Sequence, residues 1–275
     1  MNKKVLVVLS EWGFWGEELI GPLEALDAAG YESIFATPKG NRPPALPPSM
    51  DASYTDPPLG RCVVSEEMAE KTKAIDASPR LDNPMSIEAL MPERPYLSTG
   101  DYFRKLEAYY HDLEEVTENK LAEYEALLLV GGSGPLIDMV NNQRLHDIIL
   151  AFVAMNKPVA AECYGVTCLA FARDIRNKKS IILGKRVTGH PLEYDYKDGT
   201  GFVGADINIG PPPYPLEYIL RDSVGPDGEY ISNVGNRTSV IVDYPFITSR
   251  STASSVLCGK KLIECMETGL KRYGW

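Results

Sequence analysis

One nine-residue segment, VAAECYGVT at residues 159–167, constrains the fold more than any other part of the chain. Small apolar residues at 159–161, typical of a buried parallel strand, lead through Glu162 to Cys163, and Gly165 follows two positions later, where a helix is expected to begin. A strand that turns sharply into a helix around a nucleophile is a nucleophile elbow, here with cysteine in place of serine. The segment therefore predicts an α/β fold in which Cys163 stands at the carboxyl end of a sheet strand.

Alternating strand and helix patterns flank the elbow on both sides. Apolar runs predict strands at 4–9, 31–37, 126–130 and 157–161. Helical spacing predicts helices at 17–29, 103–121, 144–155, 165–173 and 252–270, and a β-hairpin is expected within 230–248. Strands that alternate with helices at this spacing predict a doubly wound, mainly parallel sheet. We expect a single domain over residues 1–275.

Residues 38–102 have a different character. They contain proline pairs at 43–44, 47–48 and 57–58 and little periodicity. A stretch this long without elements of its own is unusual inside a compact domain. We interpret it as an insertion in the N-terminal half of the chain that caps the sheet, either as a lid or dimer arm or as a passive surface decoration. Residues 192–215, rich in Gly, Pro and Tyr, are expected to close the other side of the pocket.

Cys163 is the candidate nucleophile. The helix behind it would point its N-terminus at the sulfur and favour the reactive thiolate. The alternative is a buried, inert thiol, the usual state of cysteine, and this is our interpretation of Cys168. The five cysteines are widely spaced and form no C-x-x-C pair, so we expect free thiols in a reduced, cytosolic protein and no metal site.

A glycine-rich turn, GGSG at residues 131–134, ends the strand before the elbow strand. It is not a dinucleotide fingerprint, because Ile137 stands where the third glycine is needed, and no P-loop lysine follows. We interpret the turn as part of an oxyanion hole, in which the backbone N–H groups of Gly132 and Tyr164 would stabilise negative charge. No cofactor is expected.

Glu18 lies in the first turn of the first predicted helix, beside the end of the first strand, where ligands of doubly wound sheets bind. A protonated Glu18 could hydrogen-bond the Cys163 sulfur, or the carboxyl could act as a general acid or base; the alternative is a carboxylate that complements the helix dipole. Trp12, Phe14 and Trp15 would raise its pKa by desolvation. The substrate pocket is expected to include Trp15, Gly131 and Ser133.

His190 follows a strand-like stretch downstream of the elbow, where a base for Cys163 could stand. The other two histidines, His111 and His146, lie in helical segments, and we expect them at the surface. Glu162, directly before the nucleophile, is acidic where an apolar residue is expected, and the sequence gives no reason for it.

The net charge of the chain is −10, with a pI near 4.9. This disfavours nucleic acids and anionic membranes as partners, because a polyanion would be repelled over most of the surface. No signal peptide precedes the first strand-like segment, and no apolar run is long enough to span a bilayer. We expect a cytoplasmic protein with a small-molecule substrate.

These elements together resemble the ThiJ/PfpI superfamily, the branch of class I glutamine amidotransferase-like proteins that includes protein deglycases, glyoxalase III and heat-shock chaperone members. The matching motifs are Glu18-x-x-x-Pro22, Gly131-Gly132, the elbow at 161–165, the T-x-H-P form at 188–191 and the T-S-R junction at 248–250. The resemblance covers about residues 3–37 and 121–270. Chain length and the long insertion are more like the heat-shock glyoxalase branch.

The resemblance implies a flavodoxin-like α/β sandwich, a cysteine-dependent enzyme and a homodimer. The chain departs from the family pattern at two positions, since many members carry His where Tyr164 stands and the heat-shock branch often has His where Ser133 stands. His190 would then replace the missing histidine, or Glu18 would be the only proton-transfer group.

We therefore expect Cys163 to attack a small electrophilic carbonyl or amide-type substrate, with Glu18 and His190 moving protons, as in a glyoxalase III-like lyase or a small-molecule hydrolase. Two alternatives stay open. One is a stress-response chaperone or redox sensor in which Cys163 is oxidised. The other is a biosynthetic hydratase or hydrolase of a specialised metabolite, suggested by the aromatic, proline-rich residues 194–218.

Overall fold

An eight-stranded sheet forms the centre of the computed structural model, which describes residues 3–96, 100–194 and 215–275. Its strands are β1 (Lys3–Val8), β2 (Tyr31–Thr37), β5 (Met85–Ser86), β6 (Tyr124–Leu129), β7 (Val159–Glu162), β10 (Val240–Asp243), β11 (Phe246–Ser249) and β12 (Arg272–Tyr273). Their order is β12-β10-β11-β7-β6-β1-β2-β5. The strands from β11 to β5 are parallel, and β10 is antiparallel to β11 and β12. The predicted mainly parallel α/β sheet is confirmed.

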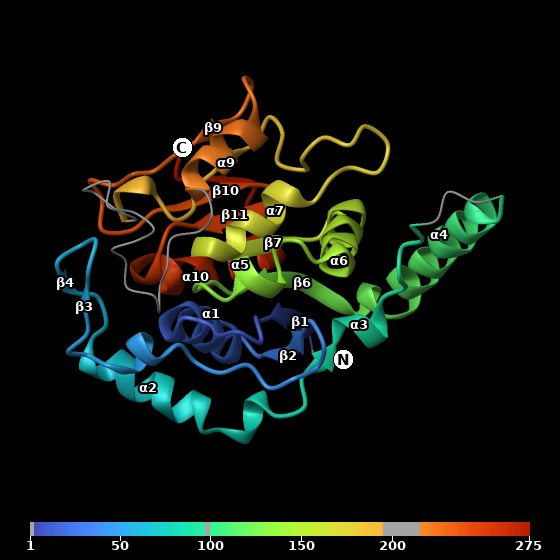
Figure 1. Ribbon diagram of the computed structural model, residues 1–275. Helices are drawn as coiled ribbons and strands as arrows, with labels where there is room; N and C mark the ends of the chain where they lie inside the picture. The colour runs from blue at the N-terminus through green and yellow to red at the C-terminus, as the bar shows by residue number, and fades with distance from the viewer. Residues whose placement is uncertain (1–2, 97–99, 195–214) are drawn as a thin grey trace.

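Helices cover both faces of this sheet (Figure 1). One face packs against α1 (Gly16–Ala28) and α10 (Ser255–Glu267), and the other against α6 (Gln143–Ala154), α7 (Thr167–Phe171) and α9 (Leu216–Val224). Glycines bring α1 and α10 together at their backbones, since a Cβ on Gly21 would lie 2.7 Å from the Val256 nitrogen. Because α1 is fixed against α10 in this way, its first turn is held at the carboxyl edge of the sheet.

Residues 38–102 contain more regular structure than the sequence pattern indicates. Their elements, apart from β5, are β3 (Thr55–Asp56), β4 (Arg61–Cys62), α2 (Glu66–Asp76) and α3 (Ile87–Leu90), with 3-10 turns at Pro47–Met50 and Pro79–Leu81. The expectation of a stretch without elements is therefore wrong for α2. A local signal was present, because Ser65 caps α2 by accepting a hydrogen bond from the Met68 N–H at 3.2 Å.

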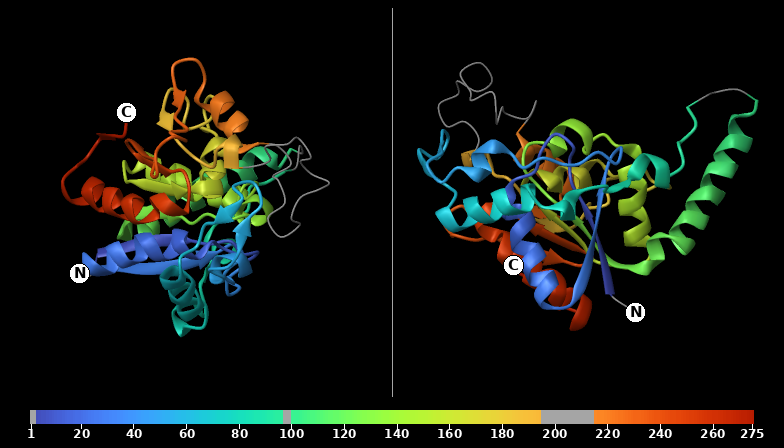
Figure 2. Two further views of the ribbon diagram at one scale, coloured as in Figure 1. Left: turned by 90° about the vertical axis from the view of Figure 1, so that its left-hand side faces the viewer. Right: turned by 90° about the horizontal axis from the view of Figure 1, so that it is seen from below.

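Helix α4 (Tyr102–Asn119) projects away from the rest of the molecule (Figures 1 and 2). Tyr109 is its one buried residue, and it anchors the helix by donating a hydrogen bond to Asp147, which also pairs with Arg94 at 3.1 Å. The neighbouring Tyr110 is 37% exposed.

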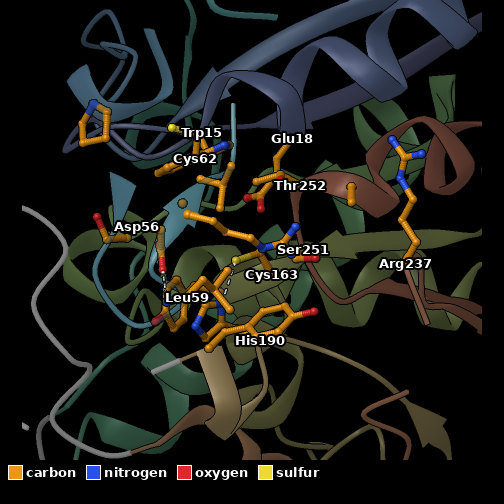
Figure 3. A pocket seen from close by; sticks show the side chains of 18 of the residues that line it. Trp15, Glu18, Asp56, Leu59, Cys62, Cys163, His190, Arg237, Ser251 and Thr252 are labelled. Carbon is orange, nitrogen blue, oxygen red and sulfur yellow. Dashed lines mark hydrogen bonds between the residues drawn. The ribbon is translucent and has the colours of Figure 1, made fainter. Parts of the chain in front are cut away.

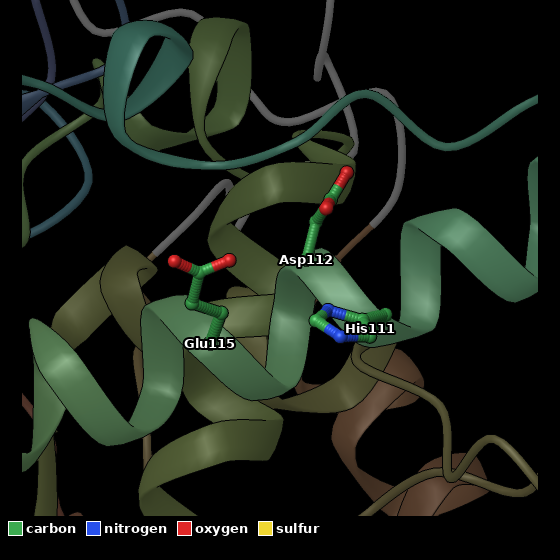
Figure 4. A group of neighbouring side chains, drawn as sticks. All are labelled: His111, Asp112 and Glu115. Atoms are coloured by element: carbon green, nitrogen blue, oxygen red, sulfur yellow. The ribbon is translucent and has the colours of Figure 1, made fainter.

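A group of exposed side chains on α4 has a spacing that could hold a metal ion (Figure 4). The ligand atoms of His111, Asp112 and Glu115 lie within 4.8 Å of one another. The exposure of His111 agrees with its expected surface position. Exposed acidic groups at helical spacing commonly hold no ion, and we assign this group no function.

The remaining elements are short. They are α5 (Pro135–Asp138), β8 (Arg186–Val187), β9 (Glu229–Tyr230) and 3-10 turns at Leu121–Glu123, Cys163–Val166, Leu192–Tyr194 and Thr252–Ser254. Strands β8 and β9 pair in parallel as a separate small sheet, so the predicted hairpin within 230–248 is limited to β10 and β11. Within the described ranges, no helix combines the length and apolar character needed to cross a membrane.

Candidate active site

The backbone is strained at Cys163, the residue directly after β7. Its φ is +50°, in the left-handed region that residues other than glycine rarely adopt. The side chain is 6% exposed. A Cβ on Gly165 would lie 2.9 Å from the carbonyl oxygen of Leu129, so the turn can pack against β6 only because this position has no side chain. This is the geometry of a nucleophile elbow.

The resting sulfur keeps its proton, contrary to the expectation of a thiolate. Behind the elbow, a 3-10 turn and the five-residue α7 stand where a longer helix was expected, which leaves little helix dipole to stabilise charge. Burial raises the pKa of the Cys163 thiol well above its ordinary value, and the Glu18 carboxyl raises it further. The backbone N–H groups of Tyr164 and Gly132 act in the opposite direction.

Glu18 is the acidic neighbour of the nucleophile. Its side chain is 1% exposed, and burial raises its pKa well above the ordinary value, with a further contribution from Glu162. The carboxyl is therefore protonated at neutral pH. Trp15 lines the same cavity, whereas Trp12 is 64% exposed and cannot provide the desolvation expected of it.

Gly131 separates Glu18 from the nucleophile. A Cβ at this position would lie 2.3 Å from Glu18 Oε2, 2.5 Å from the carbonyl oxygen of Glu162 and 2.9 Å from Cys163 Cβ. Real Cβ atoms do not approach other atoms this closely, so any side chain here would push the carboxyl away from the sulfur. The next residue, Gly132, has a φ of +95°, which turns its N–H toward the site.

His190 reaches the sulfur from the other side. Its Nδ1 lies 3.5 Å from Cys163 Sγ. The imidazole stacks on the ring of Tyr164, with centroids 4.3 Å apart and an angle of 27° between the planes. The ring centroid of Tyr194 lies 6.0 Å from that of His190, with the two rings nearly perpendicular. Tyr164 thus orients a histidine that comes from elsewhere in the chain.

The second histidine of the sequence prediction lies in the core. His146 is 8% exposed, and its Nε2 is 2.8 Å from the carbonyl oxygen of Val140. Burial lowers its pKa. The expected surface position is therefore wrong, and the reason is that α6 turns this side chain toward the sheet.

All of the predicted site residues except Gly131 line one cavity of about 460 Å³ (Figure 3). Gly131, which was also expected in the pocket, lies between Glu18 and Cys163 and is not part of the cavity lining. The cavity is lined by Cys163, Glu18, His190, Gly132, Tyr164, Trp15 and Ser133. Further walls come from segments for which the sequence gave no site residue: Leu46, Pro48, Asp56, Leu59, Arg61, Cys62, Val63, residues 234–237 and residues 251–253. Segment 38–102 therefore builds part of the cavity. Tyr194 also lines it, but most of residues 192–215, expected to close the pocket, lies outside the described residues.

A fully buried arginine holds one of these walls in place. Arg250, the first residue after β11, is 0% exposed. Its guanidinium donates hydrogen bonds to the backbone carbonyl oxygens of Ser232, Asn233, Asn236 and Arg237. It also lies 5.4 Å from the ring centroid of Tyr194. The loop 232–237 is thus fixed by a buried cation that bonds to its backbone, and the T-S-R junction in the sequence was the signal for it.

Glu162 supports the site from behind. It is fully buried on the face of β7 that packs against α10, and it accepts a hydrogen bond from Ser249 Oγ at 3.0 Å. Burial raises its pKa to about 8, although Ser255, Ser249 and Cys258 act against this rise. A mostly protonated carboxyl under the elbow explains how an acidic residue can occupy this position, and it places a second proton-holding group close to Glu18.

We predict that Glu162→Gln changes how stability depends on pH. The folded-state pKa of about 8 lies above the ordinary value of 4.5, so stability from the bound proton is full below pH 4.5 and is lost as pH rises toward 8. The free energy of unfolding of the wild type, relative to the variant, should fall by up to about 1.4 kcal/mol per pH unit in this window. Urea denaturation from pH 5 to 8 measures this. Glu114→Gln on exposed α4 is the control, and parallel curves for Glu162→Gln would contradict the prediction.

Comparison with known proteins places this site in a family. A family model described as ThiJ/PfpI family-like matches residues 9–187. The chain belongs to the ThiJ/PfpI family. The family match ends just before His190. The elbow and Glu18 are therefore inside the ThiJ/PfpI match, whereas His190 and Arg250 lie beyond it.

Individual relatives are distant. The chain is 27% identical over 169 residues to the protein/nucleic acid deglycase HchA of Pseudomonas aeruginosa, covering 58% of this chain and 53% of that protein. It is 30% identical over 81 residues to the probable glutathione-independent glyoxalase SNO4 of Saccharomyces cerevisiae, covering 30% of this chain and 34% of that protein. The chain thus spans about half the length of the deglycase, or less for the glyoxalase.

Solved structures share the fold over almost the whole chain. The Rapid Encystment Protein 24 KDa of Francisella tularensis aligns with a TM-score of 0.65 at 21% identity, covering 96% of this chain and 99% of that one. The glyoxalase III of Candida albicans aligns with a TM-score of 0.58 at 16% identity, covering 97% and 98%. These likenesses establish a flavodoxin-like α/β fold, as expected.

Proposed function

We propose that this ThiJ/PfpI protein is a cysteine-dependent enzyme that acts on small electrophilic carbonyl compounds, with 2-oxoaldehydes as the first candidates. The observation that carries the proposal is the Cys163 sulfur on a strained turn, 3.5 Å from His190 Nδ1 and beside the Glu18 carboxyl, inside a cavity of about 460 Å³. A relative named as a deglycase and one named as a probable glyoxalase support this substrate class.

The proposed reaction begins with proton removal from the thiol. His190 takes the thiol proton as the sulfur adds to the aldehyde carbon, and the N–H groups of Gly132 and Tyr164 stabilise the oxyanion that forms. Glu18 then gives its proton to this oxygen. As a carboxylate, Glu18 removes the hydrogen of the former aldehyde carbon as a proton and passes it to the neighbouring carbon. His190 gives a proton to the oxygen of the neighbouring carbon and takes one from the oxygen of the former aldehyde carbon.

The last step restores the enzyme. The proton transfer leaves a thioester on Cys163, and water hydrolyses it to a 2-hydroxy acid and the free thiol. One oxoaldehyde and one water give one hydroxy acid, so no oxidant or reductant is consumed. The raised pKa of Glu18 suits this route, because the group must be neutral before it can donate.

Proton NMR in D₂O tests the proposal. We expect methylglyoxal and glyoxal to yield lactate and glycolate, with deuterium on the carbon next to the carboxylate, because Glu18 exchanges its proton with solvent. Propanal, which lacks the second carbonyl, and acetamide are the matched controls and should not react. Hydrolysis of the amide without conversion of either oxoaldehyde would contradict the proposal and favour the hydrolase alternative.

The Glu18 proton also supports a second candidate function. A carboxyl group protonated next to a sulfur can donate a hydrogen bond to a cysteine sulfinate, which would favour a redox sensor. Mild hydrogen peroxide followed by peptide mass spectrometry separates the two functions. Selective sulfinic acid at Cys163, together with no conversion of oxoaldehydes, would favour the sensor.

A further inference from the structure

Positively charged side chains line the cavity, although the protein as a whole is acidic. Two arginines line it, Arg61 and Arg237, while the net charge of the chain is −10. Both arginines are exposed to the cavity or to solvent. Among residues 3–96, 100–194 and 215–275, neither side chain has an ion-pair or hydrogen-bond partner in the structure, in contrast to Arg42, Arg80 and Arg221. Their charge is therefore available to a ligand.

The acidic groups on the same walls do not cancel this charge. Glu18 is protonated, for the reasons given above. Asp56 pairs with Arg61 across the β3–β4 hairpin in backbone register, but its Oδ1 accepts a hydrogen bond from the Leu59 N–H at 2.9 Å. Asp56 and Arg237 lie on opposite sides of Cys163 in Figure 3. The cavity walls thus carry two guanidinium groups, and Asp56 is the one acidic side chain besides Glu18 among the residues that line the cavity.

Hydrogen bonds from the buried Arg250 fix the backbone position of Arg237. Arg250 bonds to the carbonyl oxygen of Arg237 itself at 3.1 Å and to that of Asn236 at 2.5 Å. The backbone from which the Arg237 side chain extends is therefore held before any ligand binds. A pre-positioned cation costs less ordering on binding than one on a loose loop.

We propose that the cavity selects substrates that carry an anionic group, with Arg61 and Arg237 attracting that group while the electrophilic carbon meets Cys163. The inference rests on the proposed function only in using the same reacting sulfur. Within a low-dielectric cavity, a positive potential raises the local concentration of anionic ligands. A planar guanidinium can donate two parallel hydrogen bonds to a carboxylate, so the anionic group that we expect is a carboxylate.

Two alkylating reagents test this without any turnover. Iodoacetate and iodoacetamide have nearly the same size and the same leaving group, and they differ by one negative charge. We measure the rate of Cys163 alkylation by each, resolved from Cys62 by peptide mass spectrometry. The ratio of the two rates is the readout, because any change in the ionisation of the thiol affects both reagents equally.

We expect the iodoacetate-to-iodoacetamide ratio at Cys163 to exceed that of N-acetylcysteinamide in solution, by roughly threefold to tenfold at low salt. Arg61→Gln and Arg237→Gln should each lower the ratio, and the double variant should abolish the excess. Arg104→Gln, which removes the same charge on exposed α4, should leave it unchanged. The excess should shrink as ionic strength rises.

A second measurement distinguishes the kind of anion. Acetate should protect Cys163 from iodoacetamide, and acetamide should not; stronger protection by inorganic phosphate than by acetate would overturn the choice of a carboxylate. A wild-type ratio equal to that of the free thiol would overturn the proposal, as would an excess that survives in the double variant. Labelling of Cys163 by neither reagent would overturn it too, because the cavity would then admit no ligand of this size. None of these results depends on whether oxoaldehydes are converted, so the proposed function can fail separately.

Discussion

Cys163→Ser is expected to lower kcat/KM for methylglyoxal by at least about a thousandfold. The substitution keeps the size and burial of the side chain but replaces the thiol with a hydroxyl group, which is far harder to ionise next to His190. The proposed reaction requires a covalent bond to this atom, so binding in the cavity cannot compensate for its loss.

The measurement is steady-state turnover of methylglyoxal, with circular dichroism to show that the variant is folded. Cys62→Ser is the matched control, because this second thiol lines the same cavity on the β3–β4 hairpin. We expect Cys62→Ser to stay within about threefold of the wild type. If Cys163→Ser retained more than a tenth of the activity, covalent catalysis by this residue would be excluded.

Arg250→Met is expected to destabilise the fold by roughly 3 kcal/mol. The guanidinium is completely buried and bonds to four backbone carbonyl oxygens of the 232–237 loop. Methionine can fill much of the volume but cannot donate, so carbonyl groups that are partly enclosed lose their partner. Each orphaned acceptor costs about 1 kcal/mol or more unless water replaces the donor.

Urea denaturation at pH 7 measures the loss. Arg250→Lys is the matched control: it keeps the charge but reaches fewer carbonyl groups, so its stability should lie between the wild type and Arg250→Met. A loss below about 1 kcal/mol for Arg250→Met would show that the loop does not depend on this clamp. Arg250→Met should also lower the ratio of iodoacetate to iodoacetamide labelling at Cys163, because the backbone of Arg237 would no longer be held in place.

The parts of the fold that the sequence predicted are those with strong local patterns. The strands predicted at residues 4–9 and 126–130 are continuous apolar runs whose side chains are buried on both faces, and their positions are confirmed to within two residues. Cys163 and Glu18 were found because strand ends in a parallel sheet share one edge. The family resemblance added the role of Gly131, whose necessity becomes clear only from the atoms that surround it.

The wrong predictions and the overlooked site residues have physical causes that no local sequence pattern reveals. The protonation of Cys163 depends on burial and on a carboxyl from a distant helix, neither of which a strand-to-helix motif reports. Arg61 and Arg237 are ordinary polar residues in loops, and only the folded chain brings them to the same cavity. His146 was placed at the surface because it lies in a helical segment between Leu145 and Asp147, whereas its ring points inward and bonds to the carbonyl oxygen of Val140.

Segment 38–102 has a consequence for how this protein can change over time. The ends of the sheet strands and helix α1 hold Cys163, Glu18 and Gly131 in place. Backbone atoms approach one another so closely there that a side chain added at Gly131 or Gly21 would clash. The hairpin that contributes Arg61, residues 55–62, is exposed or half-buried throughout. Mutations there can alter which compounds enter without touching the bond-making atoms, so new substrate preferences can evolve in one stretch of the gene while the reaction is inherited intact in another.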